Sequence, residues 1–139
     1  MSNFRIEVEG ADLAIDMLDS DDWRRLALEE AKEIRERTET RGLDVNNEVF
    51  KPYTKAYADY RAEKGRSTWP NLSFTGKMLG ALGSNVSSTD TSATITLSGD
   101  EGNKAWSNER RGREFMGVTR ERLDKIAEEL GDMLLTRIK

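Results

Sequence analysis

Residues 119–138 constrain the fold most strongly. Apolar side chains there recur at steps of three and four, the spacing that lines one face of an α-helix. They are Leu123, Ile126, Ala127, Leu130, Met133, Leu134 and Ile138. Thr119 precedes them, and its hydroxyl can accept a hydrogen bond from an amide group that the first turn of a helix leaves unpaired. We therefore expect a long amphipathic helix after Thr119, with an apolar face that needs a partner.

A second long helix is predicted to begin near Ser20 and to run to about Thr40. Apolar side chains recur at helical spacing from Trp23 to Ile34, and the aspartates beside Ser20 can cap the first turn. Acidic residues crowd the start of this segment and arginines crowd its end, which matches the helix dipole. Gly42 is placed to end the helix.

Two segments have the alternation that is typical of β-strands. Phe4, Ile6 and Val8 alternate with charged residues near the N-terminus. The runs Asn85–Ser88 and Ala93–Ser98 are joined by a turn-prone Thr-Asp-Thr, and the second run alternates apolar and hydroxyl side chains. These patterns predict one strand and a hairpin that share a small, mostly antiparallel sheet.

Shorter elements are predicted between these. Residues 11–18 are expected to form a helical turn or two, and residues 53–64 a short helix with three tyrosines on one side. A further short helix carries Met78, Leu79 and Leu82, and Ser73 or Thr75 can cap it. Residues 99–102 are expected to break the chain, so that only a helical turn forms over 103–109 before a looped stretch over 110–117.

Together these elements predict a single α+β domain over residues 1–139, in which the sheet packs against two long amphipathic helices. Hydrophobic residues make up 36% of the chain and charged residues 35%. Such a composition gives a thin core beneath a heavily charged surface. A chain of this kind gains stability by burying surface against copies of itself.

The side chains that most enzymes use are missing. The chain has no Cys and no His, which removes disulfides, thiolate chemistry and the commonest general base and metal ligand. The 26 acidic residues lie mostly on polar helix faces or at helix starts, where capping and dipole effects account for them. We therefore expect no catalytic residues, no metal and no cofactor.

The overall charge and hydropathy limit the partners. A formal net charge of −4 argues against duplex DNA as the main ligand, because phosphate contacts need a concentrated basic surface. The first residues lack the apolar run of a signal peptide, and no apolar run reaches the length of a membrane span. A soluble chain that is assembled in a reducing cytoplasm is expected.

One segment is locally basic. Between Lys51 and Arg66 five basic residues stand against two acidic ones, in the same stretch as the three tyrosines. Bases of a single strand stack on aromatic rings while cations hold the phosphates. A small nucleic-acid-binding protein that uses this segment is therefore the alternative from another functional class.

Two stretches resemble a known family. The first runs from Phe50 to Tyr57 (FKPYTKAY) and continues through the KGRS at residues 64–67 and the PNLSFTGKMLGAL at residues 70–82. The second is AWSNERRGREFMG at residues 105–117, just before the predicted C-terminal helix; many relatives have His where this chain has Ser107. In order and spacing they resemble the phage virion morphogenesis and tail-completion proteins of Mu-like and related tailed phages.

The resemblance implies a structural role in the virion. Relatives are short α+β proteins taken to sit as rings, often of six subunits, between the head connector and the tail tube. Partners would be further copies of the chain, the neck connector and tail-tube or tail-terminator proteins, with DNA contact only as a secondary feature. Head closure or tail termination at the same neck is the alternative within this family.

Ten residues are candidates for a subunit or partner interface. For those around Phe50 and around Phe115 the sequence leaves two roles open, since each side chain can pack in its own core or anchor a neighbouring subunit. The ten candidates are Phe50, Pro52, Tyr53, Tyr57, Trp69, Trp106, Asn108, Arg113, Phe115 and Met116.

Overall fold

The computed structural model describes residues 4–9, 18–72 and 76–137, and the side chains of the last two ranges. Its elements confirm the α+β class. Along the chain they are β1 (Phe4–Glu9), α1 (Ser20–Arg35), a π-helical turn (Glu36–Thr40), α2 (Lys55–Glu63), α3 (Lys77–Gly80), a 3-10 turn (Leu82–Ser84), β2 (Val86–Ser88), β3 (Ser92–Leu97), α4 (Gly99–Arg110) and α5 (Arg120–Arg137).

The three strands form one antiparallel sheet in the order β1-β3-β2. β1 pairs with β3 from Phe4 opposite Leu97 to Glu9 opposite Ser92. In β3 the alternating Ala93, Ile95 and Leu97 are buried. The predicted N-terminal strand, the hairpin and its apolar face are therefore confirmed.

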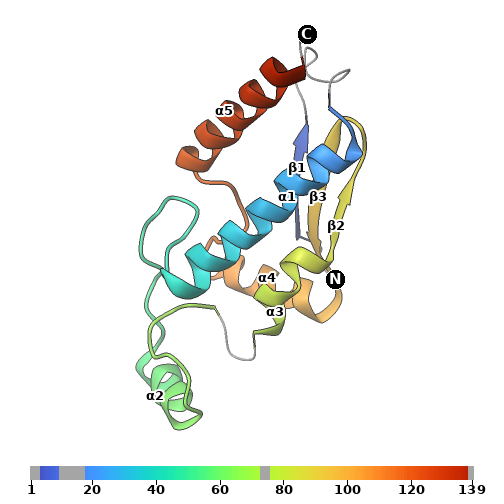
Figure 1. The fold of residues 1–139 in the computed structure, drawn as a ribbon. Helices are drawn as coiled ribbons and strands as arrows, with labels where there is room; N and C mark the ends of the chain where they lie inside the picture. Colours follow the sequence, from blue (N-terminus) through green and yellow to red (C-terminus); the bar gives the residue numbers. More distant parts are fainter. Residues whose placement is uncertain (1–3, 10–17, 73–75, 138–139) are drawn as a thin grey trace.

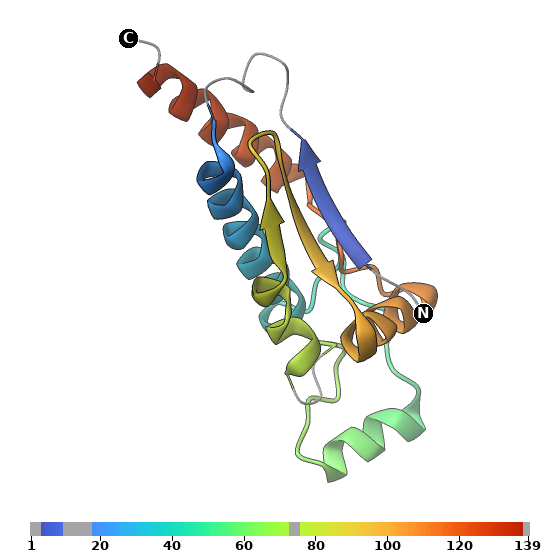
Figure 2. The same ribbon diagram turned by 90° about the vertical axis from the view of Figure 1, so that its right-hand side faces the viewer.

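α1 covers one face of this sheet (Figures 1 and 2). Its apolar stripe from Trp23 to Ile34 is buried, and the Asp19 side chain accepts a hydrogen bond from the Asp22 amide at the first turn. The π-helical turn continues the helix to Thr40, as the sequence predicted. Gly42 follows with a φ of +65°, a conformation that favours glycine and ends the helix.

The position of α5 corrects part of the prediction. Thr119 caps the helix as expected, because its hydroxyl accepts a hydrogen bond from the Arg122 amide at 3.2 Å. However, α5 lies beside α1, and among its described side chains Ile126 is the buried one. Leu123 is 52% exposed and Leu135 is 70% exposed. Packing of two long helices on the sheet is therefore confirmed for α1 and only in part for α5.

Ion pairs with α1 hold the two ends of α5. Arg122 donates to Glu30 at 3.0 Å, near the start of α5 and in the second half of α1. Arg137, at the end of α5, bonds to Asp22 at the start of α1. The two helices are therefore antiparallel.

α4 is longer than the sequence suggested. Residues 99–102, expected to break the chain, form the first turn of a helix that runs to Arg110. Gly99 has a φ of +61° and reverses the chain directly after β3, while Asp100 and Glu101 provide the negative charge that favours a helix start. Gly102 is buried, so a small residue there permits close packing and does not mark an end.

Some predictions lie outside the described residues, namely the helical turns over residues 11–17 and the caps Ser73 and Thr75. The burial of the strand residues Phe4, Ile6 and Val8 is likewise not described. At the start of α3 the capping position is Gly76, with a φ of +81°.

Residues 51–72 form an arm that carries α2 away from the sheet and α1 (Figures 1 and 2). As predicted, the three tyrosines share one side: the Tyr53 and Tyr57 ring centroids are 4.9 Å apart, and those of Tyr57 and Tyr60 are 6.2 Å apart. Arg61 is buried beneath them and donates to the Ser67 carbonyl at 2.6 Å and to the Asn71 side chain at 3.1 Å. The arm thus has a small centre of its own.

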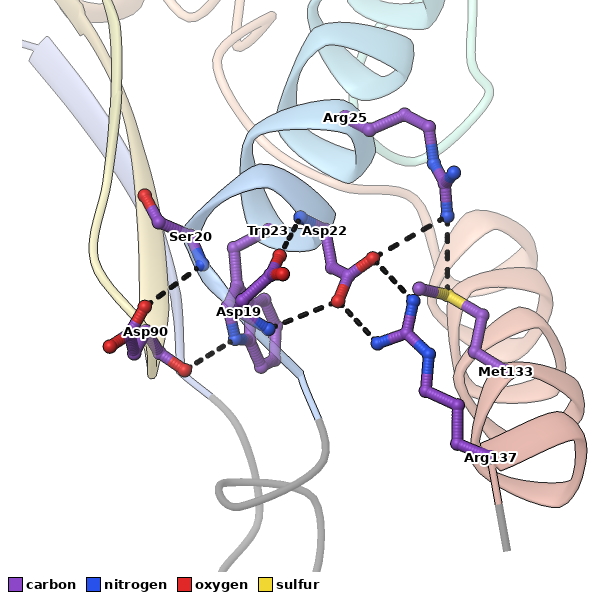
Figure 3. A network of polar contacts seen from close by, with 8 residues as sticks. All are labelled: Asp19, Ser20, Asp22, Trp23, Arg25, Asp90, Met133 and Arg137. Carbon is purple, nitrogen blue, oxygen red and sulfur yellow. Dashed lines mark hydrogen bonds and ion pairs between the residues drawn. The ribbon is translucent and has the colours of Figure 1, made fainter. Parts of the chain in front are cut away.

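One polar network joins three distant elements at the start of α1 (Figure 3). Asp90, at the tip of the hairpin, accepts hydrogen bonds from the Ser20 amide at 3.1 Å and, through its carbonyl, from the Trp23 indole at 3.0 Å. Asp22 bonds to Arg137 on one side and to the Asp19 amide on the other. The network fixes the hairpin tip, the start of α1 and the end of α5 relative to one another.

Asp22 gives this network a predicted pH dependence. The Arg137 guanidinium holds the pKa of the Asp22 carboxyl well below its usual range, so the carboxylate stabilises the fold above the unfolded pKa of about 4. That stabilisation is lost as the pH falls toward the folded pKa. We expect Asp22→Asn to lower the urea midpoint most above about pH 5, with a gap that shrinks below about pH 3. A gap of equal size at both ends of this range would show that the charge is not involved.

Candidate functional site

A groove of about 870 Å³ lies between the arm, α3 and α4. We call it the groove. Its lining residues are Lys51, Pro52, Tyr53, Thr54, Tyr57, Arg61, Leu72, Gly76, Lys77, Met78, Lys104, Ser107, Asn108, Arg111 and Arg113.

The lining is cationic although the chain is acidic. Six of these residues are Lys or Arg and none is Asp or Glu, whereas the whole chain carries a formal charge of −4. Four of the cations are exposed, and their charges add to a local positive potential. The exposed four are Lys51, Lys77, Lys104 and Arg111, and Glu101 partly offsets Lys104 at 3.3 Å.

The two buried cations of the groove lie against one tyrosine ring. The guanidinium carbon of Arg113 is 4.8 Å from the centroid of Tyr53, and that of Arg61 is 5.0 Å from it. Burial raises the pKa of the Tyr53 hydroxyl, so the ring stays neutral at physiological pH. Such cation–π contacts fix the wall of the groove that the arm provides.

The two stretches that resemble the phage family meet at this wall. Arg113, from the second stretch, donates to the carbonyls of Lys51 at 2.9 Å and Pro52 at 3.0 Å, in the first stretch. These bonds tie the base of the arm to the segment after α4. Segments about sixty residues apart in the sequence therefore form one surface.

Buried charges also position the segment that leads from α4 to α5. The Glu109 carboxylate accepts hydrogen bonds from the amides of Phe115 at 3.1 Å and Met116 at 2.9 Å, and burial raises its pKa. From the other side, the fully buried Arg37 donates to the carbonyls of Phe115 at 2.6 Å and Gly117 at 3.2 Å. The backbone here lacks helix or strand partners, and these side chains supply them.

The structure brings five of the ten candidate residues together in the groove: Pro52, Tyr53, Tyr57, Asn108 and Arg113. Of the two roles that the sequence left open for Phe50 and Phe115, the core role applies, because both side chains are buried in the chain's own core. Met116 is half-buried and packs against that core.

The two candidate tryptophans lie outside the groove lining, and both are partly exposed. Trp69 lies so close to Gly42 that a Cβ there would come within 2.9 Å of its ring. Trp106 lies beneath Arg110, whose guanidinium carbon is 5.0 Å from the centroid of the indole. Trp69 belongs to the arm, and Trp106 belongs to α4.

Sequence reasoning missed Lys77, Lys104 and Arg111 as part of the site. Residues 104, 107, 108 and 111 recur at helical steps of three and four, and all four line the groove. The signal was therefore in the sequence. It was hidden because only a short turn was expected over residues 103–109.

The chemistry of the groove suits binding. Lys and Arg side chains attract anionic groups, and the two tyrosines add aromatic surface. Within the described ranges, no group of three or more Asp or Glu side chains is arranged to hold a metal ion. None of the described helices is both long enough and apolar enough to cross a membrane.

No family model, curated protein or solved structure matches the chain significantly.

Arg113 is predicted to be the main link between the arm and the body. Arg113→Ala leaves the carbonyls of Lys51 and Pro52 without this donor and removes one cation from Tyr53. We expect the free energy of unfolding to fall by about 2–4 kcal/mol, measured by urea denaturation. The exposed Arg111→Ala is the matched control and should change it by less than about 0.5 kcal/mol. Equal losses in the two variants would contradict this role for Arg113.

Proposed function

We propose that the protein is a structural component of a tailed bacteriophage virion, which completes the tail and joins it to the head at the neck. In this role the chain forms a ring of copies and contacts the neck connector and the tail-tube or tail-terminator proteins. It acts through buried subunit interfaces, without turnover of a substrate.

One observation carries the proposal. The two stretches that resemble tail-completion proteins form a single surface, in which Arg113 joins the base of the arm and both stretches line the groove. If the function depended on only one of the two stretches, the hydrogen bonds from Arg113 that join them would not be needed for it. An arm that projects from a small body can also bind a neighbouring protein.

The exposed surface of α5 supports the same conclusion. Leu123 and Leu135 are large apolar side chains that remain more than half exposed in the single chain. A second copy or a neck partner that covers this helix would remove them from water, which favours association.

The test is made in the phage. We expect deletion of the gene from its phage or prophage to leave filled heads and tails that fail to join, as seen by electron microscopy of the lysate. A plasmid copy should restore infectious particles, and mass spectrometry should find the chain in purified virions. Normal virions without the protein would overturn the proposal.

The defect also separates the alternatives within the neck. Loss of DNA from unjoined heads would indicate head closure, and tails of irregular length would indicate tail termination. Filled heads beside tails of uniform length would indicate tail completion.

The groove favours a second candidate function, the binding of single-stranded nucleic acid. The basic segment from Lys51 to Arg66 does not form the surface by itself, because Lys55 pairs with Asp59 at 3.0 Å and Arg61 is buried. The groove as a whole offers exposed cations beside Tyr57.

A nucleic-acid ligand would give a steep salt dependence. The binding constant for an oligonucleotide, measured by fluorescence anisotropy, would fall with salt by a log–log slope of about −0.7 per phosphate contact. Lys51→Gln with Lys77→Gln would then lower both affinity and slope, whereas Lys55→Gln would serve as the control outside the groove. If the chain is a neck protein of the proposed kind, the wild-type chain should bind the oligonucleotide no more tightly than the doubly substituted variant does.

A further inference from the structure

One face of α5 carries a row of carboxylates. Glu121, Asp124, Glu128 and Asp132 follow one another at steps of three and four, so they lie on one side of the helix, and all four are exposed. The ion pairs that tie α5 to α1 use Arg122 and Arg137. We call these four residues the acidic row.

The acidic row faces away from the body of the chain. Arg122, Ile126 and Met133 face α1, since they contact or pack beside its residues. At about 100° per residue, Asp124 and Glu128 lie on the opposite side of the helix. The exposed Leu135 falls in line with the row, and the exposed cations Arg120 and Lys125 border it. This face therefore carries four carboxylates and one large apolar side chain, with a cation on either side.

The groove has the complementary pattern. Four exposed cations line it against the four carboxylates of the row, and Pro52 and Tyr57 add exposed apolar surface beside them. Exposed ion pairs contribute little one at a time, so a stable contact needs several together with burial of apolar groups. Both conditions are met by these two surfaces.

The two surfaces lie at different ends of the molecule. The groove is formed near α2, α3 and α4. The helix α5, which carries the row, lies toward the opposite end of the molecule from α2 (Figure 1). A copy that places its row in the groove of the next copy leaves its own groove open for a third. Such a head-to-tail contact repeats, and it closes into a ring when the rotation between copies permits.

We propose that the groove binds the acidic row of α5 from a second copy of this chain. This inference rests on the proposed function, because it names the contact from which the ring is built. Charge favours this occupant over nucleic acid, since the chain itself supplies an exposed row of four carboxylates and is acidic as a whole.

The experiment uses charge reversal on each surface of the full chain. One variant carries Lys51→Glu and Arg111→Glu in the groove, and the other carries Asp124→Lys and Glu128→Lys in the row. Each is examined by sedimentation velocity up to about 1 mM protein, so that contacts with a millimolar Kd are seen. The runs are made at about 0.05 M and about 1 M salt, because screening weakens exposed charge pairs.

We expect the wild-type chain to associate at low salt. Each variant alone should remain monomeric, because reversing two of the four exposed charges on one of its surfaces leaves those four charges summing to zero. An equal mixture of the two variants should associate again, since the unaltered groove of one variant can then bind the unaltered row of the other. A tenfold or greater loss of association in each variant, with recovery in the mixture, is the expected result.

Two matched controls carry the same charge changes elsewhere. Lys32→Glu with Lys64→Glu changes two exposed lysines outside the groove lining, and Glu29→Lys with Glu36→Lys changes two exposed carboxylates outside the row. Both controls should associate like the wild type. Circular dichroism checks that each variant is folded before its association is measured.

Three results would overturn the inference. They are a wild-type chain that stays monomeric at every concentration, variants that associate as well as the wild type, and a mixture that shows no recovery. If the groove variant loses only oligonucleotide binding, the ligand of the groove is nucleic acid. The proposed function is judged separately by the virions, because a ring that survives these reversals would use another contact and still belong to the neck.

Discussion

The packing of α1 on β3 is the contact on which the rest of the structure depends. It buries Trp23, Ile34 and the alternating side chains of β3 in the hydrophobic core. With 36% hydrophobic residues the chain has little else to bury. Apolar side chains from the other elements, among them Phe50, Leu79 and Phe115, join this core. A few charged side chains then fix the loops that connect those elements.

Three buried arginines provide much of that attachment. Arg37 bonds to the carbonyls of Phe115 and Gly117, Arg61 to that of Ser67, and Arg113 to those of Lys51 and Pro52. Each one satisfies backbone groups in a segment that has no helix or strand partner. A guanidinium has five donors in a fixed plane, so one side chain can hold two carbonyls that a loop brings together. Burial lowers the pKa of Arg37, but the group still serves as a donor.

The elements with strong local signals were predictable from the sequence. The alternation in residues 4–9 and in β3, the aspartates before α1 and the hydroxyl of Thr119 act within a few residues. The structure has both strands, the buried alternation of β3 and both helix caps. The length of α4 was missed because Gly99 and Gly102 were taken as breaks, whereas one reverses the chain and the other permits close packing. A local pattern predicts the conformation of its own segment. Whether a glycine ends a helix or allows it to pack closely depends on the neighbouring elements.

Features that depend on distant segments were predictable only in part. The period of α5 shows which side is apolar but not what that side meets, so its position beside α1 could not be foreseen. Half of the candidate interface residues line the groove because two stretches recognised together also meet in space. The lysines that complete its lining come from α3 and α4. Helical spacing places Lys104 on the same face as Ser107 and Asn108, but it does not show that this face meets the arm.

The loose attachment of α5 has a consequence for assembly. Two ion pairs, the buried Ile126 and three partly buried apolar side chains hold this helix, whereas α1 buries a full apolar stripe. It should therefore open from the body at a lower free energy than α1 does. A neighbour that binds the outer side of α5 restricts this local opening. The next copy then binds a chain that is already ordered, so its binding has a smaller entropic cost. Order would then spread from copy to copy, so that partly built assemblies are scarce compared with free chains and closed ones.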